Sequence, residues 1–240
     1  MVTRFAIHRH TLSSYSSYGF RTLFLTALSI IVFFDVSVAK ELDIIDYPIL
    51  TTNRLELTRK YAKRHYDMDT YLLKDPKMIV VHYTAVPSLE QTLTVFKPDY
   101  VPSHRSKLAT YGEVNVGTHY VVGFKGQIYG LIPTTVMARH VIGFNHVAIG
   151  IENVSGNEAG LTDVQLEANA QLIAYLTMKH PSIKYMIGHL EYMNKRHPHA
   201  HLYKAKDPFY QPYVKIDPGT TFMRRLRKLL KEKYDIVLEK

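Results

Sequence analysis

The apolar positions along the chain predict a sheet built from short strands. Residues 77–84 form a continuous apolar run, which is typical of a central strand covered on both faces. A second apolar strand is expected at 148–154, and a short third one at 184–188. These runs place strands in the middle and in the second half of the chain.

A hairpin is expected between the first two of these strands. The runs 119–124 and 127–132 flank Lys125-Gly126, which suits a two-residue turn. Residues 40–50 have the pattern of an extended lead-in, whereas 97–117 hold two prolines, two glycines and scattered charge. The latter segment predicts a long connection, and long connections in compact domains are commonly functional or mobile.

Helical signals separate the predicted strands. Asn53-x-x-Glu56 and Thr162-x-x-Gln165 have the spacing of a capping box, and Ser88 suits an N-cap. The helices expected from these signals and from apolar residues at helical spacing lie at about 54–66, 88–96, 162–180 and 221–234. Strands mixed with helices and a hairpin predict an α/β or α+β domain around one sheet.

The N-terminus has the pattern of a targeting segment. Basic residues without an acid precede an apolar run at 23–34, and Ser37-Val38-Ala39 offers small residues for a signal peptidase. The run is shorter than the roughly 20 residues that a membrane-spanning helix needs. We therefore expect a signal peptide at 1–39, export to the periplasm or the extracellular space, and no stable membrane insertion after cleavage. An uncleaved anchor remains the alternative.

The chain has no cysteine, which limits both its stabilisation and its metal chemistry. An exported protein of this composition has no disulfides, so its core or a metal must stabilise it. A lipid anchor on an N-terminal cysteine is excluded. Zinc sites with cysteine ligands are excluded too, which leaves histidine and carboxylate side chains.

The net charge of +9 does not by itself indicate a class of binding partner. Its densest part is 224–228, where arginine and lysine surround Leu226 at helical spacing. This pattern is typical of the solvated face of a helix, so we expect no nucleic-acid partner. The sequence gives no indication of the oligomeric state.

Two histidines end predicted strands. His82 lies just before the expected end of 77–84, and His189 follows a strand and a glycine. Histidines in such runs are often hydrogen-bonded core residues, but ligands prefer strand ends in open α/β sheets. Asp217-Pro218-Gly219 has the composition of an ordinary turn. Two imidazoles and a carboxylate would suit catalytic zinc with one open position, although their spacing alone does not establish it.

The order of several short motifs resembles the zinc-dependent type 2 N-acetylmuramoyl-L-alanine amidases. The resemblance rests on His82, on Ile149-Gly150-Ile151-Glu152, on Gly188-His189, and on Lys215-x-Asp217-Pro218-Gly219 with Phe222. It covers roughly residues 78–232. The family shares its fold with peptidoglycan recognition proteins and phage amidase lysozymes. The resemblance thus implies an α/β domain with a central mixed sheet flanked by helices, at 77–234, after an N-terminal extension at 40–76.

The resemblance also implies roles for single residues. One zinc ion per chain would be held by His82, His189 and Asp217, in agreement with the lack of cysteine. Glu152 would be the general base, and Lys215 would stabilise the oxyanion. The candidates for substrate contacts are His119, His140 and Asn145, although either histidine ring could equally form hydrogen bonds in the core.

The chain departs from the family pattern between His189 and Asp217, which are usually close together. Residues 191–214 are expected to be an insertion at the rim of the cleft. Its aromatic and basic residues suit either substrate binding or packing over the sheet edge. Its run His197-Pro198-His199-Ala200-His201 could bind a second metal or be an exposed loop.

The implied function is zinc-dependent hydrolysis of the amide between N-acetylmuramic acid and L-alanine, in peptidoglycan or muropeptides. Two alternatives remain open. One is a non-catalytic peptidoglycan-recognition module on the same fold, since fold does not settle function. The other is a zinc peptidase that cuts within cell-wall peptides.

Overall fold

The computed structural model describes residues 42–240. The signal peptide expected at 1–39 lies outside these residues. Within them, none of the helices combines the length and the apolar character that a membrane span requires.

A single mixed sheet of six strands organises this part of the chain, in the order β1-β4-β3-β5-β2-β6. β3, β5, β2 and β6 are parallel neighbours, whereas β4 is antiparallel to β3 and carries β1 parallel to it at the edge. The strands are β1 (Ile44–Asp46), β2 (Met78–Tyr83), β3 (Tyr120–Val122), β4 (Ile128–Gly130), β5 (Ala148–Asn153) and β6 (Tyr185–Gly188). The α/β class with one central mixed sheet is confirmed.

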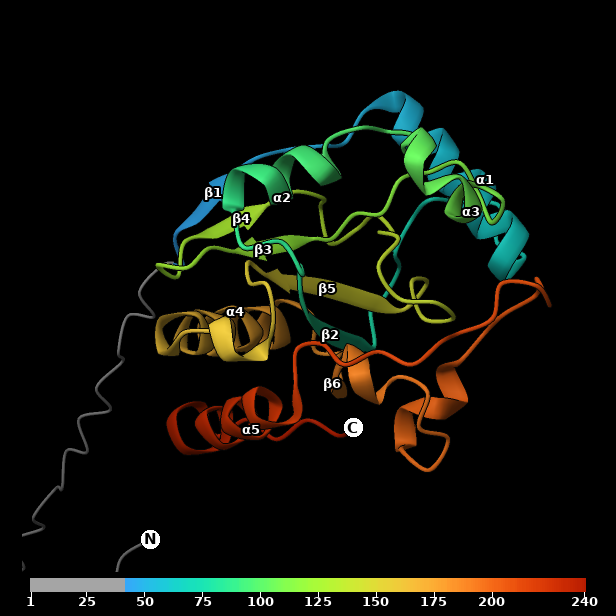
Figure 1. Cartoon of the computed structure of the whole chain (residues 1–240). Coiled ribbons are helices and arrows are strands. Elements are labelled where there is room, and N and C mark those ends of the chain that lie inside the picture. Colours follow the sequence, from blue (N-terminus) through green and yellow to red (C-terminus); the bar gives the residue numbers. More distant parts are fainter. Residues whose placement is uncertain (1–41) are drawn as a thin grey trace, which may run out of the picture. The chain divides into compact units, whose positions relative to one another are not determined.

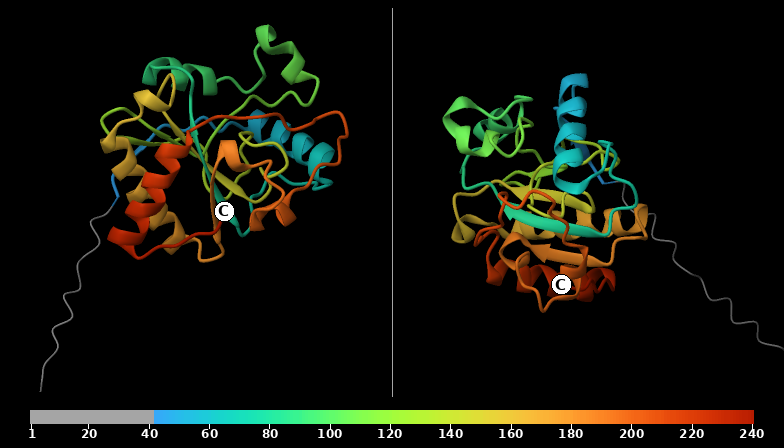
Figure 2. Two further views of the ribbon diagram at one scale, coloured as in Figure 1. Left: turned by 60° about the horizontal axis from the view of Figure 1, so that its bottom comes forward. Right: turned by 90° about the vertical axis from the view of Figure 1, so that its right-hand side faces the viewer.

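Helices cover both faces of the sheet (Figure 1). α4 and α5 pack side by side below it in this view, and α1 and α2 lie above it (Figures 1 and 2). The helices are α1 (Thr52–Tyr66), α2 (Leu89–Phe96), α3 (Ser106–Ala109), α4 (Asp163–Lys179) and α5 (Thr220–Tyr234). Because β2 lies between these layers, its residues Met78 to Val81 are fully buried. The prediction of a strand covered on both faces is confirmed.

Two local predictions were wrong. Thr51, not Asn53, caps α1: its hydroxyl accepts the Arg54 N–H at 2.9 Å, while the Asn53 amide donates to Asp99. The hairpin turn is also longer than two residues. The Gly123 N–H donates to the Gln127 carbonyl next to the paired strands, so the turn consists of all the residues between Gly123 and Gln127. The capping box of Thr162 and Gln165 on α4 is present as predicted.

Residues 42–76, expected as an N-terminal extension, contribute to the same compact unit as the rest of the described chain. β1 completes one edge of the sheet, and α1 buries apolar side chains, among them Leu57 and Tyr66, in the core. At the opposite edge, the Met186 N–H donates to the carbonyl of Glu239, and Glu239 N–H donates to Lys184. Both edges of the sheet are therefore partly covered by chain from outside the region 77–234.

Candidate metal centre

Polar residues lie at the ends of three neighbouring parallel strands. The register pairs His82 on β2 with Glu152 on β5, and it pairs Val81 with Gly188, the last residue of β6. His189 follows directly after β6. Because parallel strands end at the same edge of a sheet, the carboxyl ends of β5, β2 and β6 bring these side chains together. Polar side chains that are far apart in the sequence therefore lie close together at one edge of the sheet.

His82, His189 and Asp217 form a compact group of possible metal ligands. His82 Nδ1 lies 2.9 Å from His189 Nδ1, and Asp217 Oδ2 lies 3.2 Å and 3.1 Å from these two nitrogens. No other group of three such side chains occurs among residues 42–240. Donor atoms around a tetrahedral zinc with Zn–N bonds of about 2.0–2.1 Å lie roughly 3.3 Å apart. The three atoms therefore fit zinc in both chemical type and spacing.

Steric crowding explains why glycines lie near two of these possible ligands. A Cβ on Gly188 would lie 2.9 Å from both Met223 of α5 and Pro218, so a side chain there would push the ligand segments apart. Gly219 has a φ of +103°, and a Cβ would overlap Glu158. That glutamate accepts the first N–H groups of α5, from Thr221 and Phe222. These contacts explain the glycines of the Gly-His and Asp-Pro-Gly motifs.

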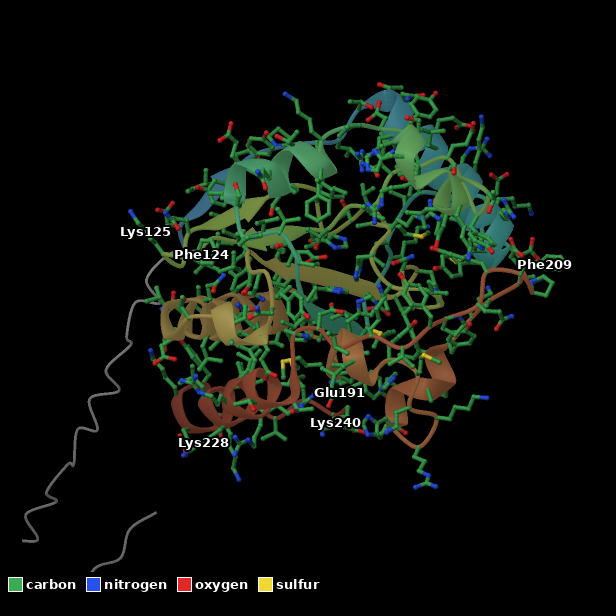
Figure 3. The ribbon with its side chains drawn as sticks, in the orientation of Figure 1. Phe124, Lys125, Glu191, Phe209, Lys228 and Lys240 are labelled. Carbon is green, nitrogen blue, oxygen red and sulfur yellow. The ribbon has the colours of Figure 1, made fainter. Side chains whose placement is uncertain are left out.

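Backbone contacts hold the second and third ligands together. The N–H of Leu190, directly after His189, donates to the carbonyl of Asp217 at 2.8 Å. The Glu191 carboxylate accepts a hydrogen bond from the Gly188 N–H at 2.9 Å, and it forms an ion pair with Arg227 on α5. Figure 3 shows Glu191 close to Lys240, whose ammonium lies 3.3 Å from the carboxylate.

Charge and burial favour a cation at this centre. Burial acts to raise the pKa of Asp217, but its close contacts with His189 and His82 outweigh this effect and hold that pKa well below its usual range. Burial also lowers the pKa of His189 to about 4. An ionised carboxylate and a neutral imidazole are the forms that bind metals.

Glu152 has the environment of a proton acceptor. Burial raises the pKa of its carboxyl to about 7, and the nearby charge of Asp217 acts in the same direction. Its Oε2 is shielded from solvent and has no hydrogen-bond partner among the described residues. A carboxylate with a pKa near neutrality and a free oxygen can exchange protons with a reacting molecule at physiological pH.

Lys215 does not contact the three ligands. Its ammonium donates to the Tyr213 hydroxyl at 2.7 Å and lies 4.2 Å from the centre of that ring. Its positive charge nevertheless acts to lower the pKa of both Glu152 and His189. In this structure the ammonium of Lys215 is thus held by Tyr213.

The three residues expected to contact substrate have different surroundings. His119 is fully buried: Nε2 donates to the Val136 carbonyl at 3.0 Å, and Nδ1 accepts the Gly150 N–H at 2.9 Å. Asn145, with 1% exposure, fixes the loop that carries His140. The polar atoms of these two residues form hydrogen bonds inside the core, and their role toward substrate stays a prediction. His140 is partly exposed and hydrogen-bonds to His82.

The segment 191–214, which is expected to be an insertion, is anchored to the body of the domain at several points. Tyr210 is buried against Arg139 and Tyr111, and Asp207 forms an ion pair with Arg64 of α1. His199 is buried too, and its ring lies against Phe144. The histidines of 197–201 form no group of possible ligands.

The end of this insertion is exposed instead. Phe209 is 78% exposed and points away from the domain beside the end of α1 (Figure 3), and Val214 is 79% exposed. Neither the contact of Tyr213 with Lys215 nor the burial of Tyr192 beside His189 was foreseen from the sequence. No local pattern marks either tyrosine, since both contacts depend on the path of the insertion.

Comparison with known families decides the relationship. The family model of N-acetylmuramoyl-L-alanine amidases matches residues 72–219. The chain belongs to this family. The match includes both histidines, Glu152, Lys215 and Asp217, and the whole insertion. A search of curated proteins returned no match.

Several solved structures are similar to this amidase-family chain. N-acetylmuramoyl-L-alanine amidase LysC from Clostridium intestinale is 23% identical, with 68% of this chain and 87% of that one covered and a TM-score of 0.44. A selenomethionine derivative of AmpD is 24% identical, with 65% and 86% covered and a TM-score of 0.45. Drosophila PGRP-LB is 19% identical, with 51% and 75% covered and a TM-score of 0.41.

Proposed function

We propose that this family member is a zinc-dependent amidase that hydrolyses the bond between N-acetylmuramic acid and L-alanine in peptidoglycan or muropeptides. The observation that carries the proposal is the convergence of His82 Nδ1, His189 Nδ1 and Asp217 Oδ2 to within 3.2 Å of one another. Glu152 supports it, because it is paired with His82 on the neighbouring strand and has a pKa of about 7.

The ligand residues fit one zinc ion, which His82, His189 and Asp217 would hold. The chemistry that zinc supplies when bound is polarisation of the amide carbonyl and acidification of a water molecule. Three protein ligands leave a position for substrate or water, as catalytic zinc sites require. Substrate would bind near the carboxyl ends of β2 and β6, where these residues lie.

Glu152 would move the protons of the reaction. Its unpartnered Oε2 accepts a proton from the attacking water and passes it to the nitrogen of the leaving L-alanine. The raised pKa suits both steps, because a carboxyl with a pKa near 7 accepts and releases a proton with similar ease. Lys215, after release from Tyr213, would stabilise the negative charge on the carbonyl oxygen.

We further propose that the protein acts outside the cytoplasm, on the basis of the leader expected at 1–39. The alternative of a non-catalytic recognition module is disfavoured by the ligand group and Glu152 being present together. No observation favours the peptidase alternative.

Product analysis tests the proposed reaction. Purified zinc-loaded protein is incubated with a disaccharide-peptide muropeptide, and the products are identified by mass spectrometry. The proposal predicts a free disaccharide with a lactyl carboxylate and a stem peptide that begins with free L-alanine. Cleavage within the peptide would identify a peptidase, and retention of intact muropeptide on the protein would identify a recognition module.

A further inference from the structure

The second ring nitrogen of His82 has a partner that the proposed mechanism does not use. His82 Nδ1 faces the other ligands, and its Nε2 lies 3.0 Å from Nδ1 of His140. The two rings meet edge to face at 86°, with centroids 5.2 Å apart. One of these two nitrogens must donate a proton and the other must accept it.

The other ring nitrogen of His140 shows which residue donates the hydrogen bond between His82 and His140. His140 Nε2 lies 3.4 Å from the carbonyl oxygen of Ala148, which can only accept. The proton of the neutral His140 ring is therefore on Nε2, and its Nδ1 is an acceptor. The partner nitrogen, Nε2 of His82, must then carry a proton, which leaves Nδ1 of His82 with a free lone pair on the side of Asp217.

Surrounding contacts fix His140 in this position. Asn145 Oδ1 accepts the backbone N–H groups of His140 and Val141 at 2.9 Å and 2.8 Å. Its amide donates to the Tyr61 hydroxyl at 3.1 Å. A Cβ on Gly150 would lie 2.9 Å from the ring of His140, so only glycine leaves room for the ring.

We propose that His140 is a positioning residue that selects the metal-binding tautomer of His82. The inference rests on the proposed function, because it assumes that His82 binds zinc. Partners of this kind orient ligating histidines, and their loss commonly lowers metal affinity by about 10- to 100-fold.

Zinc affinity of variants tests this role, measured by competition with a chromophoric chelator. H140A should bind zinc about 10- to 100-fold more weakly. H140N should stay close to wild type, because the amide oxygen of asparagine can take the acceptor position of Nδ1. H180A is the matched control, since His180 contacts Thr134 and no ligand residue. Wild-type affinity in H140A, or equal weakening in H140N and H140A, would overturn the inference.

A measurement on the unaltered protein covers the case in which H140A does not fold. Nitrogen-15 NMR of the histidine rings distinguishes protonated from bare nitrogens. The inference predicts a proton on Nε2 of His140 and none on its Nδ1. A proton on Nδ1 of His140 overturns it even if zinc binds normally, whereas a wild-type protein that binds no zinc overturns the proposed function as well.

Discussion

The hydroxyl of Tyr192 forms two hydrogen bonds with the backbone of Tyr213. It accepts the Tyr213 N–H at 2.8 Å and donates to the Tyr213 carbonyl at 2.6 Å. The ring of Tyr192 is buried against His189, with centroids 4.9 Å apart. One side chain thus links a proposed zinc ligand to the segment that continues to Lys215 and Asp217.

Replacement of Tyr192 by phenylalanine should loosen this segment without emptying the core. The ring contact with His189 stays, whereas Tyr213 loses both of its hydrogen bonds to the hydroxyl. We expect a loss of about 1 kcal/mol in the free energy of unfolding. Turnover should fall between about 3-fold and 100-fold, because small displacements of catalytic groups are costly.

Y175F is the matched control for this prediction, since the Tyr175 hydroxyl makes no hydrogen bond to any residue of 42–240. Denaturant unfolding and initial rates on a muropeptide are compared for the two variants. Equal results for Y192F and Y175F would show that the link does not position the site.

Glu152 and Asp217 should give different phenotypes, although both are carboxylates at one site. E152Q should keep stoichiometric zinc but lose about 10²- to 10⁴-fold in turnover, because an amide cannot accept the proton. D217A should lose both zinc and turnover. Metal analysis and rates measured on the same samples check this. D207A is the control, because Asp207 contacts Arg64 and the Phe209 N–H but none of the possible ligands. Undiminished turnover in E152Q would remove Glu152 from the mechanism.

The raised pKa of Glu152 predicts a pH-dependent difference in stability between metal-free wild type and E152Q. Below the ordinary pKa of 4.5 the carboxyl is protonated in both the folded and the unfolded state. Between 4.5 and about 7 only the unfolded state ionises, so wild type loses stability as the pH rises. The stability gained by E152Q over wild type should therefore be larger at pH 8 than at pH 4, by up to about 3 kcal/mol. Urea unfolding at both pH values measures it, and a constant difference would contradict the assigned environment.

Two of the three possible ligands could be placed together from the sequence, because His82 lies near the end of an apolar strand and His189 follows one directly. Continuous apolar strands are typical of parallel sheets, whose strands place their carboxyl ends at one edge. Asp217 lies in no strand, so its assignment depended on the resemblance of Lys215-x-Asp217-Pro218-Gly219 to the family motif. His119 and Asn145 could not be assigned in this way. A polar side chain beside a strand can face a cleft or form hydrogen bonds inside the core. Only tertiary contacts distinguish the two cases, such as those of His119 with the Val136 carbonyl and of Asn145 with the Tyr61 hydroxyl.

The exposed end of the insertion makes a separate prediction about substrate size. Val214 is the last residue of 191–214, and Ile216 lies between this segment and Asp217; the two side chains are 79% and 71% exposed. If this surface binds the polymer, V214S/I216S should bind intact sacculi more weakly while cutting small muropeptides normally. The melting temperature should not change, because neither side chain is buried. M178S on α4, at a residue that is 69% exposed, is the control. Equal loss on both substrates would contradict the binding role.

We infer that hydrolysis depends on zinc held by His82, His189 and Asp217. The most direct test is to remove metal from the purified protein with a chelator, measure release of stem peptide from a muropeptide, and add zinc back in steps. We predict no release by the metal-free protein and full recovery at one zinc ion per chain. Undiminished release by metal-free protein, or no recovery with zinc in a protein that remains folded, would contradict the claim.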